Sequence, residues 1–413
     1  MTIIEFFDKA DINNIAGALI YEPEKVILVG SCNEEMMKSI EDYRKVLSSR
    51  FTDTVVEYKK IESNNLSEVY DRLVEIVEEN KDCVFDIAGG DDLFLVAVGM
   101  VAERFKERIQ LHRIDAGKNT VIDCDAATNI CEEIPISISV DEIISLYGGK
   151  VIYNDEKSDG TVEWDFSDDF VSDLKKMWDI FRNDIVAWNT QINELDYLRG
   201  QYQVGSDLSV KIDKEKAKAT LKKRFGFFKL SHDFFRSLSR AGLILDYDAG
   251  WETGVYAFRF KNGQIMRCLT KAGQLLEIYT TFIARGLVIE KNNFFTDYAT
   301  GVYIDWDGKL EVKGKADIHN EIDIILMKGF VPVFISCKSG DVKIEELYKL
   351  SSVADRFGGP YVKKVLLCTR LNRDKDEAEI KARAKEMGIV IIDGVGKMGI
   401  TEFRKNLCMI WNN

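Results

Sequence analysis

Short apolar runs alternate with amphipathic stretches over the first 150 residues, and this alternation most constrains how the chain can fold. Runs such as Val26–Val29 and Cys83–Ile87 have the length of buried strands, whereas Ser67–Asn80 gathers its apolar residues on one helical face. Strands that alternate with helices form a mostly parallel sheet covered on both faces. The sequence therefore predicts a Rossmann-like α/β domain over residues 1–150.

Two further regions follow. Gly148-Gly149 and an acidic, turn-rich stretch end the first domain, and residues 151–268 are expected to form a helical, winged-helix-like segment. From residue 269 to 413 the expected order of elements is αβββαβ, which is typical of a restriction-endonuclease-like core. The elements expected in these regions include helices at 170–192, 211–225, 230–241 and 271–285 and strand-like pieces at 255–260, 264–268, 318–327 and 331–337.

Charge is distributed unevenly along the 413 residues, whose net charge is −13. Residues 1–200 hold 42 acidic and 21 basic side chains, whereas residues 201–413 hold 27 acidic and 35 basic ones. A basic second half indicates that only this half meets a polyanion such as nucleic acid.

Cysteine usage and hydropathy bear on the compartment. The eight cysteines show no CxxC spacing, and most lie in apolar strand-like runs, which indicates reduced thiols of a cytoplasmic protein. No apolar run of 18 residues and no signal peptide are found, so no membrane partner is expected.

The strongest chemical pattern joins Glu277, Glu321, Asp323 and Lys338. Glu321 and Asp323 alternate along one expected strand and share a face, and Lys338 ends the next strand. Carboxylates that converge in a cleft stay ionised when a divalent cation neutralises them, and oxygen ligands suit Mg²⁺ or Mn²⁺. The pattern predicts metal-assisted phosphodiester hydrolysis, in which Lys338 orients the attacking water.

A second pattern consists of two glycine turns at the carboxyl ends of expected parallel strands. One is Gly30-Ser31-Cys32-Asn33 and the other is Ala88-Gly89-Gly90-Asp91-Asp92, and each opens a helix. Such turns hold phosphate groups. Neither matches GxGxxG or a P-loop, which argues against a dehydrogenase or a nucleoside triphosphatase. A Gly90→Val substitution is expected to block the phosphate and leave folding intact.

Together these motifs resemble the CARF-domain proteins of type III CRISPR defence in which a sensor is fused to a PD-(D/E)xK nuclease. The resemblance extends over nearly the whole chain. Its motifs are residues 22–30, the Asp86–Asp92 turn with Ala88 in place of the family's threonine, residues 269–277, Asn320–Asp323 and Ile335–Lys338.

The resemblance implies a homodimer whose paired sensor domains bind cyclic tetra-adenylate and thereby activate a nuclease that acts on DNA, RNA or both. It implies ligand contacts by the two glycine turns, a catalytic centre of Glu277, Glu321, Asp323 and Lys338, and metal ligation by Glu277, Asp323 and the backbone carbonyl of Cys337.

Two departures from the family pattern stand out. Ser336 lies where the nuclease motif has an acidic residue, so Glu277, Glu321 or Glu345 is expected to replace that ligand. Asp91 and Asp92 lie where many sensors have a lysine, and we expect them to point away and cap the helix.

Two alternatives remain open from the sequence. The chain could be a ligand-controlled DNA-binding regulator that uses the winged-helix-like segment and has an inert nuclease fold. It could also be a restriction-type nuclease whose first domain serves only in dimerisation.

Overall fold

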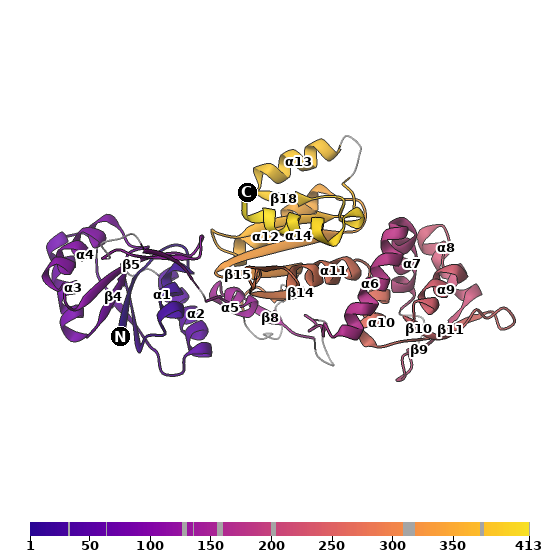
Figure 1. The fold of residues 1–413 in the computed structure, drawn as a ribbon, viewed down its shortest axis with the longest axis horizontal. Coiled ribbons are helices and arrows are strands. Elements are labelled where there is room, and N and C mark those ends of the chain that lie inside the picture. The colour runs from indigo at the N-terminus through magenta and orange to yellow at the C-terminus, as the bar shows by residue number, and fades with distance from the viewer. Residues whose placement is uncertain are drawn as a thin grey trace. The chain divides into compact units, whose positions relative to one another are not determined.

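The computed structural model describes residues 1–31, 34–62, 64–125, 130–134, 136–154, 160–199, 204–308, 319–371 and 376–412. Figure 1 labels many of its helices and strands, which form a mixed α/β architecture, as the sequence predicts. The chain divides into two compact units. The first contains Met1–Thr161, Phe295–Phe334 and Lys349–Lys364, and the second contains Val162–Phe294, Ile335–Tyr348 and Val365–Asn413.

A seven-stranded sheet lies at the centre of the N-terminal part of the first unit. Its strands, in order across the sheet, are β3 (Val55–Lys60), β2 (Lys25–Gly30), β1 (Thr2–Phe6), β4 (Cys83–Asp86), β5 (Ile109–Asp115), β6 (Thr120–Asp123) and β7 (Ile130–Glu133). β1 to β5 run parallel, whereas β6 and β7 are antiparallel strands at one edge. The predicted mostly parallel, Rossmann-like sheet is confirmed.

Helices cover both faces of this sheet because alternate residues of each strand point to opposite sides. Ile4 and Phe6 of β1 pack in one core with residues of α3 (Leu66–Glu79) and α4 (Asp92–Arg104). On the other face, Gly17 of α1 (Asn13–Tyr21) lies against Ile3 and Glu5. Next to α1 packs α2 (Glu34–Arg50), and α5 (Val140–Leu146) packs on α2.

A six-stranded sheet carries the predicted nuclease motifs. Its order is β18 (Ile389–Ile392), β17 (Lys363–Cys368), β16 (Val331–Lys338), β15 (His319–Lys328), β14 (Asp297–Asp305) and β8 (Lys150–Ile152). The associated elements are α11 (Gln274–Arg285), the short strands β12 (Val288–Ile289) and β13 (Asn292–Asn293), α12 (Ile344–Phe357), α13 (Asp376–Glu386) and α14 (Ile400–Met409). The predicted αβββαβ order is confirmed for α11, β14 to β16, α12 and β17.

The middle segment forms a winged-helix-like module in the second unit. After α6 (Asp168–Asn183) and α7 (Ile185–Leu198) come β9 (Ser209–Asp213), α8 (Lys214–Phe225), α9 (His232–Arg240), β10 (Ile244–Asp248) and β11 (Val255–Phe260). The three strands pair in the order β10, β11, β9. Two helices followed by a hairpin are the winged-helix order that the sequence predicts, and β9 is an additional strand that was not predicted.

Two predicted elements of this module are wrong. Residues 211–213 belong to strand β9 rather than to the basic helix, and residues 264–268 lie in helix α10 (Gly263–Thr270) rather than in a strand. The side chain of Asn262 accepts a hydrogen bond from the Ile265 amide at 2.9 Å and so starts α10. The buried residues Ile265, Cys268 and Leu269 follow helical spacing, and the hairpin is instead β10–β11.

Helices α5 and α14 were not expected from the sequence. α5 spans only seven residues, and a capping box of Ser139 and Glu142 begins it. None of the helices that the structure describes has the length and apolar composition that a bilayer-crossing span requires.

Two carboxyl groups lie side by side inside the seven-stranded sheet. Glu5 of β1 and Asp86 of β4 are partners in the parallel register, and each is 2% exposed. Burial raises the pKa of Asp86 to about 7, and burial together with the charge of Asp86 raises the pKa of Glu5 well above its usual value. Near neutral pH the pair therefore retains a proton.

This pair makes stability depend on pH. The Asp86 carboxyl binds its proton more tightly in the folded chain, so its contribution to stability is complete below its unfolded pKa of about 4 and is lost as pH rises through about 7. The contribution of Glu5 has the same sign and is lost as pH rises through its own raised pKa. In Glu5→Gln an amide donates to Asp86 at every pH, so we expect this variant to be more stable than the wild type at pH 8, by on the order of 1–3 kcal/mol. Urea unfolding at pH 5.5 and pH 8 measures the difference.

The matched control is Glu75→Gln, which changes an exposed carboxylate of α3. It should follow the pH profile of the wild type. A Glu5→Gln profile as steep as that of the wild type would contradict the assignment.

Candidate ligand and nuclease sites

The two predicted glycine turns lie at one edge of the seven-stranded sheet. β2, β1 and β4 are parallel neighbours, so Gly30 at the end of β2 and the Ala88–Asp92 turn after β4 flank the end of β1. A Cβ atom added to Gly30 would lie 3.1 Å from the Cβ atom of Phe7 in the turn after β1. Ser31 is exposed at this edge, and Cys32 and Asn33 lie outside the described residues.

Gly89 and Gly90 are required by the fold itself. A Cβ atom on Gly89 would collide with the carbonyl oxygen of Phe6, and one on Gly90 would lie 3.0 Å from the Cβ atom of Phe6. Gly90 also has φ +90°, which L side chains rarely adopt. The expectation that Gly90→Val leaves folding intact is therefore wrong.

Asp86 and Asp91 shape the turn from its two ends. Asp86 Oδ1 accepts hydrogen bonds from the backbone N–H groups of Ala88 at 2.9 Å and Ile114 at 3.2 Å. Asp91 Oδ1 accepts one from the Phe94 N–H at 3.3 Å and caps α4, as the sequence analysis expects. Asp92 is exposed in the first turn of that helix, where the helix dipole favours negative charge.

The sequence analysis missed two lysines near this edge. Lys9 is exposed in the turn that follows β1, and Lys60 is the register partner of Gly30 at the end of β3. Lys60 Nζ forms an ion pair with Glu62 Oε1 at 2.8 Å. The sequence could have indicated both lysines, because they follow or end expected strands and an anionic ligand at the carboxyl ends of strands needs cationic groups.

In the second unit, Glu277 is a buried carboxylate in the first turn of α11. Its side chain is 5% exposed, and its Oε2 accepts a hydrogen bond from Gln274 Nε2 at 2.9 Å. Gly273, with φ +85°, precedes the helix, and a Cβ atom there would lie 3.4 Å from Glu277 Oε1. Besides burial, the charge of Glu277 raises the pKa of the Cys268 thiol in α10. The carboxylate therefore lies beside the N-terminal end of α11, where negative charge is stabilised.

Lys338 ends β16 and forms an ion pair that the sequence analysis did not predict. Its Nζ lies 2.9 Å from Oε2 of Glu346, which is on the first turn of α12 in the same unit. Glu345, one of the three residues predicted as possible replacements for the missing acid, is exposed and lines a different hollow with Lys343 and Glu379. Glu346 is thus an acidic residue in contact with the lysine, and it follows Lys338 at the start of the next helix.

A small cavity in the second unit is lined by residues that lie close to Glu277 and to Lys338 along the chain. Gly273, Leu275 and Leu276 of the α11 region line it together with Ser339, which directly follows Lys338. Its volume is about 10 Å³, close to what a single water molecule needs. The carbonyl of Ser339 is fixed by hydrogen bonds from Asn189 Nδ2 at 2.6 Å and Thr369 Oγ1 at 3.0 Å.

In the first unit, Glu321 and Asp323 lie on the same face of β15, as predicted. Glu321 is exposed and Asp323 is half-buried. The antiparallel register passes from Thr300–Ile324 to Val302–Ile322, which puts Gly301 of β14 opposite Asp323. Gly301 has φ +60° and no side chain, so the space beside the two carboxylates stays open on this side.

The predicted metal set consists of oxygen donors only, namely the carboxylates of Glu277 and Asp323 and the carbonyl of Cys337. This donor chemistry fits Mg²⁺ or Mn²⁺, which prefer oxygen ligands. Within the described part of the chain, no three His, Cys, Asp or Glu side chains form a group that could hold a metal ion. The predicted set contains only two such side chains, from different units.

Comparison with known proteins identifies the C-terminal region. Residues 263–408, from α10 to α14, match the family model described as the Card1-like endonuclease domain. We refer to these residues as the Card1-like endonuclease domain after this similarity. The matched residues include Glu277, Glu321, Asp323, Lys338 and Glu346, so every predicted nuclease residue lies in the part of the chain that is similar to endonuclease domains. Comparison with curated proteins yields no match.

Solved structures share the fold beyond the Card1-like endonuclease domain. Protein VC1899 from Vibrio cholerae is 16% identical with a TM-score of 0.72, covering 100% of this chain and 98% of that one. Can2 from Sulfobacillus thermosulfidooxidans, solved with cyclic tetra-adenylate, is 16% identical with a TM-score of 0.63, covering 100% and 97%. A type III CRISPR defence DNA nuclease activated by cyclic oligoadenylate is 12% identical with a TM-score of 0.51, covering 90% of this chain and 46% of that one. The predicted resemblance to sensor–nuclease fusions is confirmed.

The contact between Lys338 and Glu346 leads to a test of the Card1-like endonuclease domain. We expect Glu346→Gln to reduce nuclease activity at least tenfold, because the lysine loses the carboxylate that positions it. Both side chains are partly exposed, so the melting temperature should change little. Initial rates of plasmid cleavage and thermal unfolding measure the two effects.

Glu345→Gln is the matched control, since it removes the neighbouring carboxylate, which lies in another hollow. Equal activity of both variants and the wild type would show that Glu346 has no role in the centre.

Proposed function

We propose that this protein is a metal-dependent endonuclease of type III CRISPR defence that cyclic tetra-adenylate activates. The Card1-like endonuclease domain and the fold shared with Can2 support this assignment. The observation that carries the proposed activation is a set of hydrogen bonds within the first unit. They join the domain with the glycine turns to strands β14 and β15, and β15 contains Asp323.

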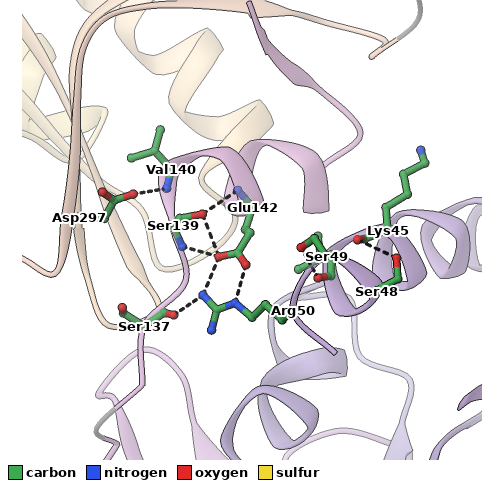
Figure 2. Close-up of polar contacts among 10 residues, drawn as sticks. Lys45, Ser48, Ser49, Arg50, Ser137, Ser139, Val140, Glu142 and Asp297 are labelled. Carbon is green, nitrogen blue, oxygen red and sulfur yellow. Dashed lines mark hydrogen bonds and ion pairs between the residues drawn. The ribbon is translucent and has the colours of Figure 1, made fainter. Parts of the chain in front are cut away.

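The first part of this junction begins at the C-terminal end of α2, the helix that follows the Gly30 turn. Arg50 forms a bidentate pair with Glu142 of α5, and its Nη2 also donates to the Ser137 carbonyl at 2.6 Å (Figure 2). Burial alone would raise the pKa of Glu142, but hydrogen bonds from Arg50 and Ser139 hold it below its usual value. The pair is therefore charged at neutral pH and fixes α2 to the start of α5.

From α5 the junction continues to the nuclease sheet. The N–H of Val140 donates to Asp297 Oδ2 at 2.8 Å, and Asp297 is the first residue of β14 (Figure 2). β14 pairs with β15 over nearly its whole length. A displacement of α2 would thus reach the strand with Glu321 and Asp323 through the side chains of Arg50, Glu142 and Asp297, the backbone of α5 and the β14–β15 ladder.

The second part of the junction is the turn between β15 and β16. Asn119, between β5 and β6, donates from Nδ2 to the Lys328 carbonyl at 3.0 Å and accepts from the Phe330 N–H at 2.7 Å. Asn119 is 6% exposed and has φ +54°. The N–H of Ile138 donates to the Gly329 carbonyl at 3.3 Å. Hydrogen bonds with the N-terminal domain therefore fix the turn between β15 and β16.

We propose that the activator shifts this junction between two arrangements. To change the ratio of active to inactive arrangement from 1:99 to 99:1, the ligand must bind the active arrangement about 5.5 kcal/mol more tightly than the inactive one. A ligand with several phosphates that contacts both glycine turns, and the nearby Lys9, supplies many contacts that depend on the arrangement.

A homodimer would place two ligand edges together, and the outer face of α4 supports it. Leu95, Val96 and Met100 are 39%, 50% and 45% exposed on this helix, which begins directly after the Gly89-Gly90 turn. Such an apolar face next to the ligand turn is suited to a second copy of the chain.

In the proposed centre, Glu277, Asp323 and the carbonyl of Cys337 hold Mg²⁺ or Mn²⁺. The bound ion supplies Lewis acidity toward a phosphate oxygen and a water of lowered pKa. Lys338 orients the attacking water, and Glu346 fixes the ammonium of Lys338. Glu321 is exposed on the same face of β15 as Asp323 and completes the proposed set of acidic residues. We propose the cytoplasm as the location, where its activator and foreign nucleic acid occur.

The decisive experiment measures plasmid and single-stranded cleavage with Mn²⁺ or Mg²⁺, with and without cyclic tetra-adenylate. We expect cleavage that depends on the ligand, and a loss of at least 100-fold in Asp323→Asn, because the variant removes a metal ligand and keeps the shape of the side chain. Asp305→Asn, in β14, is the matched control.

Equal cleavage with and without the ligand would favour a nuclease that no nucleotide controls. Tight DNA binding without cleavage would favour the regulator.

The junction has its own test. We expect Arg50→Gln to bind cyclic tetra-adenylate within about twofold of the wild type and to lose at least tenfold in ligand-stimulated cleavage, because α2 is released from α5. Isothermal titration calorimetry and cleavage rates separate the two effects. Arg44→Gln, an exposed arginine of the same helix, is the matched control. Full stimulation of Arg50→Gln would exclude this route.

A further inference from the structure

The C-terminal end of α8 carries an exposed group of aromatic rings in the winged-helix-like module. The rings of Phe225 and Phe227 stack with their centroids 5.8 Å apart and their planes at 25°. Tyr197, at the end of α7, meets Phe225 edge to face at 5.5 Å. Phe227 and Tyr197 are 41% and 44% exposed, so solvent reaches both rings. We call these three residues the aromatic surface.

Gly226 produces this arrangement. It has φ +79° and caps α8 in the left-handed conformation, which turns the chain so that Phe227 lies beside Phe225. Apart from its two chain neighbours, a Cβ atom on Gly226 would meet no atom within 4 Å, so the left-handed φ rather than crowding favours glycine here.

Cationic side chains border the aromatic surface. Lys222, Lys223 and Arg224 form the last turn of α8, and all three are exposed. The guanidinium of Arg224 lies 5.7 Å from the ring centroid of Tyr197 and 5.9 Å from that of Phe225. Among the described residues, none of the three basic side chains has an ion-pair partner within 4 Å. Positive charge at a helix C-terminus is favourable, but it gives no reason for exposed rings beside it.

Exposed rings next to unneutralised cations fit single-stranded nucleic acid. Bases stack on aromatic side chains and arginine planes, and lysines contact the phosphates without reading the sequence. Recognition of duplex DNA would instead use the exposed face of α9, because this helix has the place of the recognition helix that enters the major groove in winged-helix proteins. That face carries Asp233 beside Arg236, at 3.8 Å, so its charge is partly neutralised.

We propose that the aromatic surface and the last turn of α8 bind single-stranded nucleic acid. The surface lies outside the proposed catalytic residues, on elements that precede the Card1-like endonuclease domain in the chain. Its role as a holding site for the substrate strand rests on the proposed nuclease function, whereas the binding itself does not.

The test measures binding to a fluorescein-labelled 20-nucleotide oligothymidylate by anisotropy, with the full chain in EDTA so that no cleavage occurs. We expect Phe227→Ala to weaken binding about tenfold and Phe227→Trp to retain it, since stacking is lost in the first and kept in the second. Lys222→Gln/Lys223→Gln should weaken binding and reduce the slope of log K against log salt by about 1.4. Trp251→Ala is the control, because Trp251 is 77% exposed on the wing of the same module.

Three results would overturn the proposal: no binding by the wild type, unchanged binding by Phe227→Ala and the lysine variant, or preference for a duplex of the same length. The assay contains neither metal nor activator. Binding by the aromatic surface without ligand-dependent cleavage would therefore refute only the proposed function, and cleavage without binding at this surface would refute only this inference.

Discussion

The hydrogen-bonded junction inside the first unit is the constraint on which the proposed regulation depends. A sensor that binds a ligand at one sheet edge controls a distant centre only if its backbone is fixed to a strand of that centre. Asn119 meets this requirement at the β15–β16 turn, where its amide satisfies a carbonyl and an N–H group in buried surroundings. Arg50 and Glu142 provide a second, charged connection to β14. Asn119 is buried, so its removal would leave buried backbone groups unsatisfied, and the partly buried pair of Arg50 and Glu142 is strengthened by its charges.

At the edge of the seven-stranded sheet where the two glycine turns lie, the candidate ligand site consists mainly of backbone. Asp86 holds the turn by its hydrogen bond from Ala88, and its partner Glu5 keeps a proton in the same dry layer. The glycines leave room for the adjacent β1 turn rather than for a phosphate alone. The turn is thus rigid before any ligand arrives, which reduces the ordering that binding requires.

Much of the molecule could be predicted because its signals are local. Apolar runs and helical periodicity predicted the parallel sheet, and alternation predicted the shared face of Glu321 and Asp323. The errors have local causes as well. The Asn262 cap turns residues 264–268 into a helix, and the brief α5 depends on a capping box that apolar spacing does not reveal. Glu346 was missed because its contact with Lys338 joins a strand end to the next helix.

The sequence by itself determined the class of chemistry: acidic residues and a lysine at strand positions, glycine turns at strand ends, and a basic second half. These follow from residue type and spacing, which act over a few residues. Only the tertiary structure decided which distant groups meet, such as Arg50 with Glu142, Asn119 with the β15–β16 turn, and Tyr197 with Phe225. Such pairs lie tens or hundreds of residues apart along the chain, and their proximity results from packing of the whole fold, which no local pattern encodes.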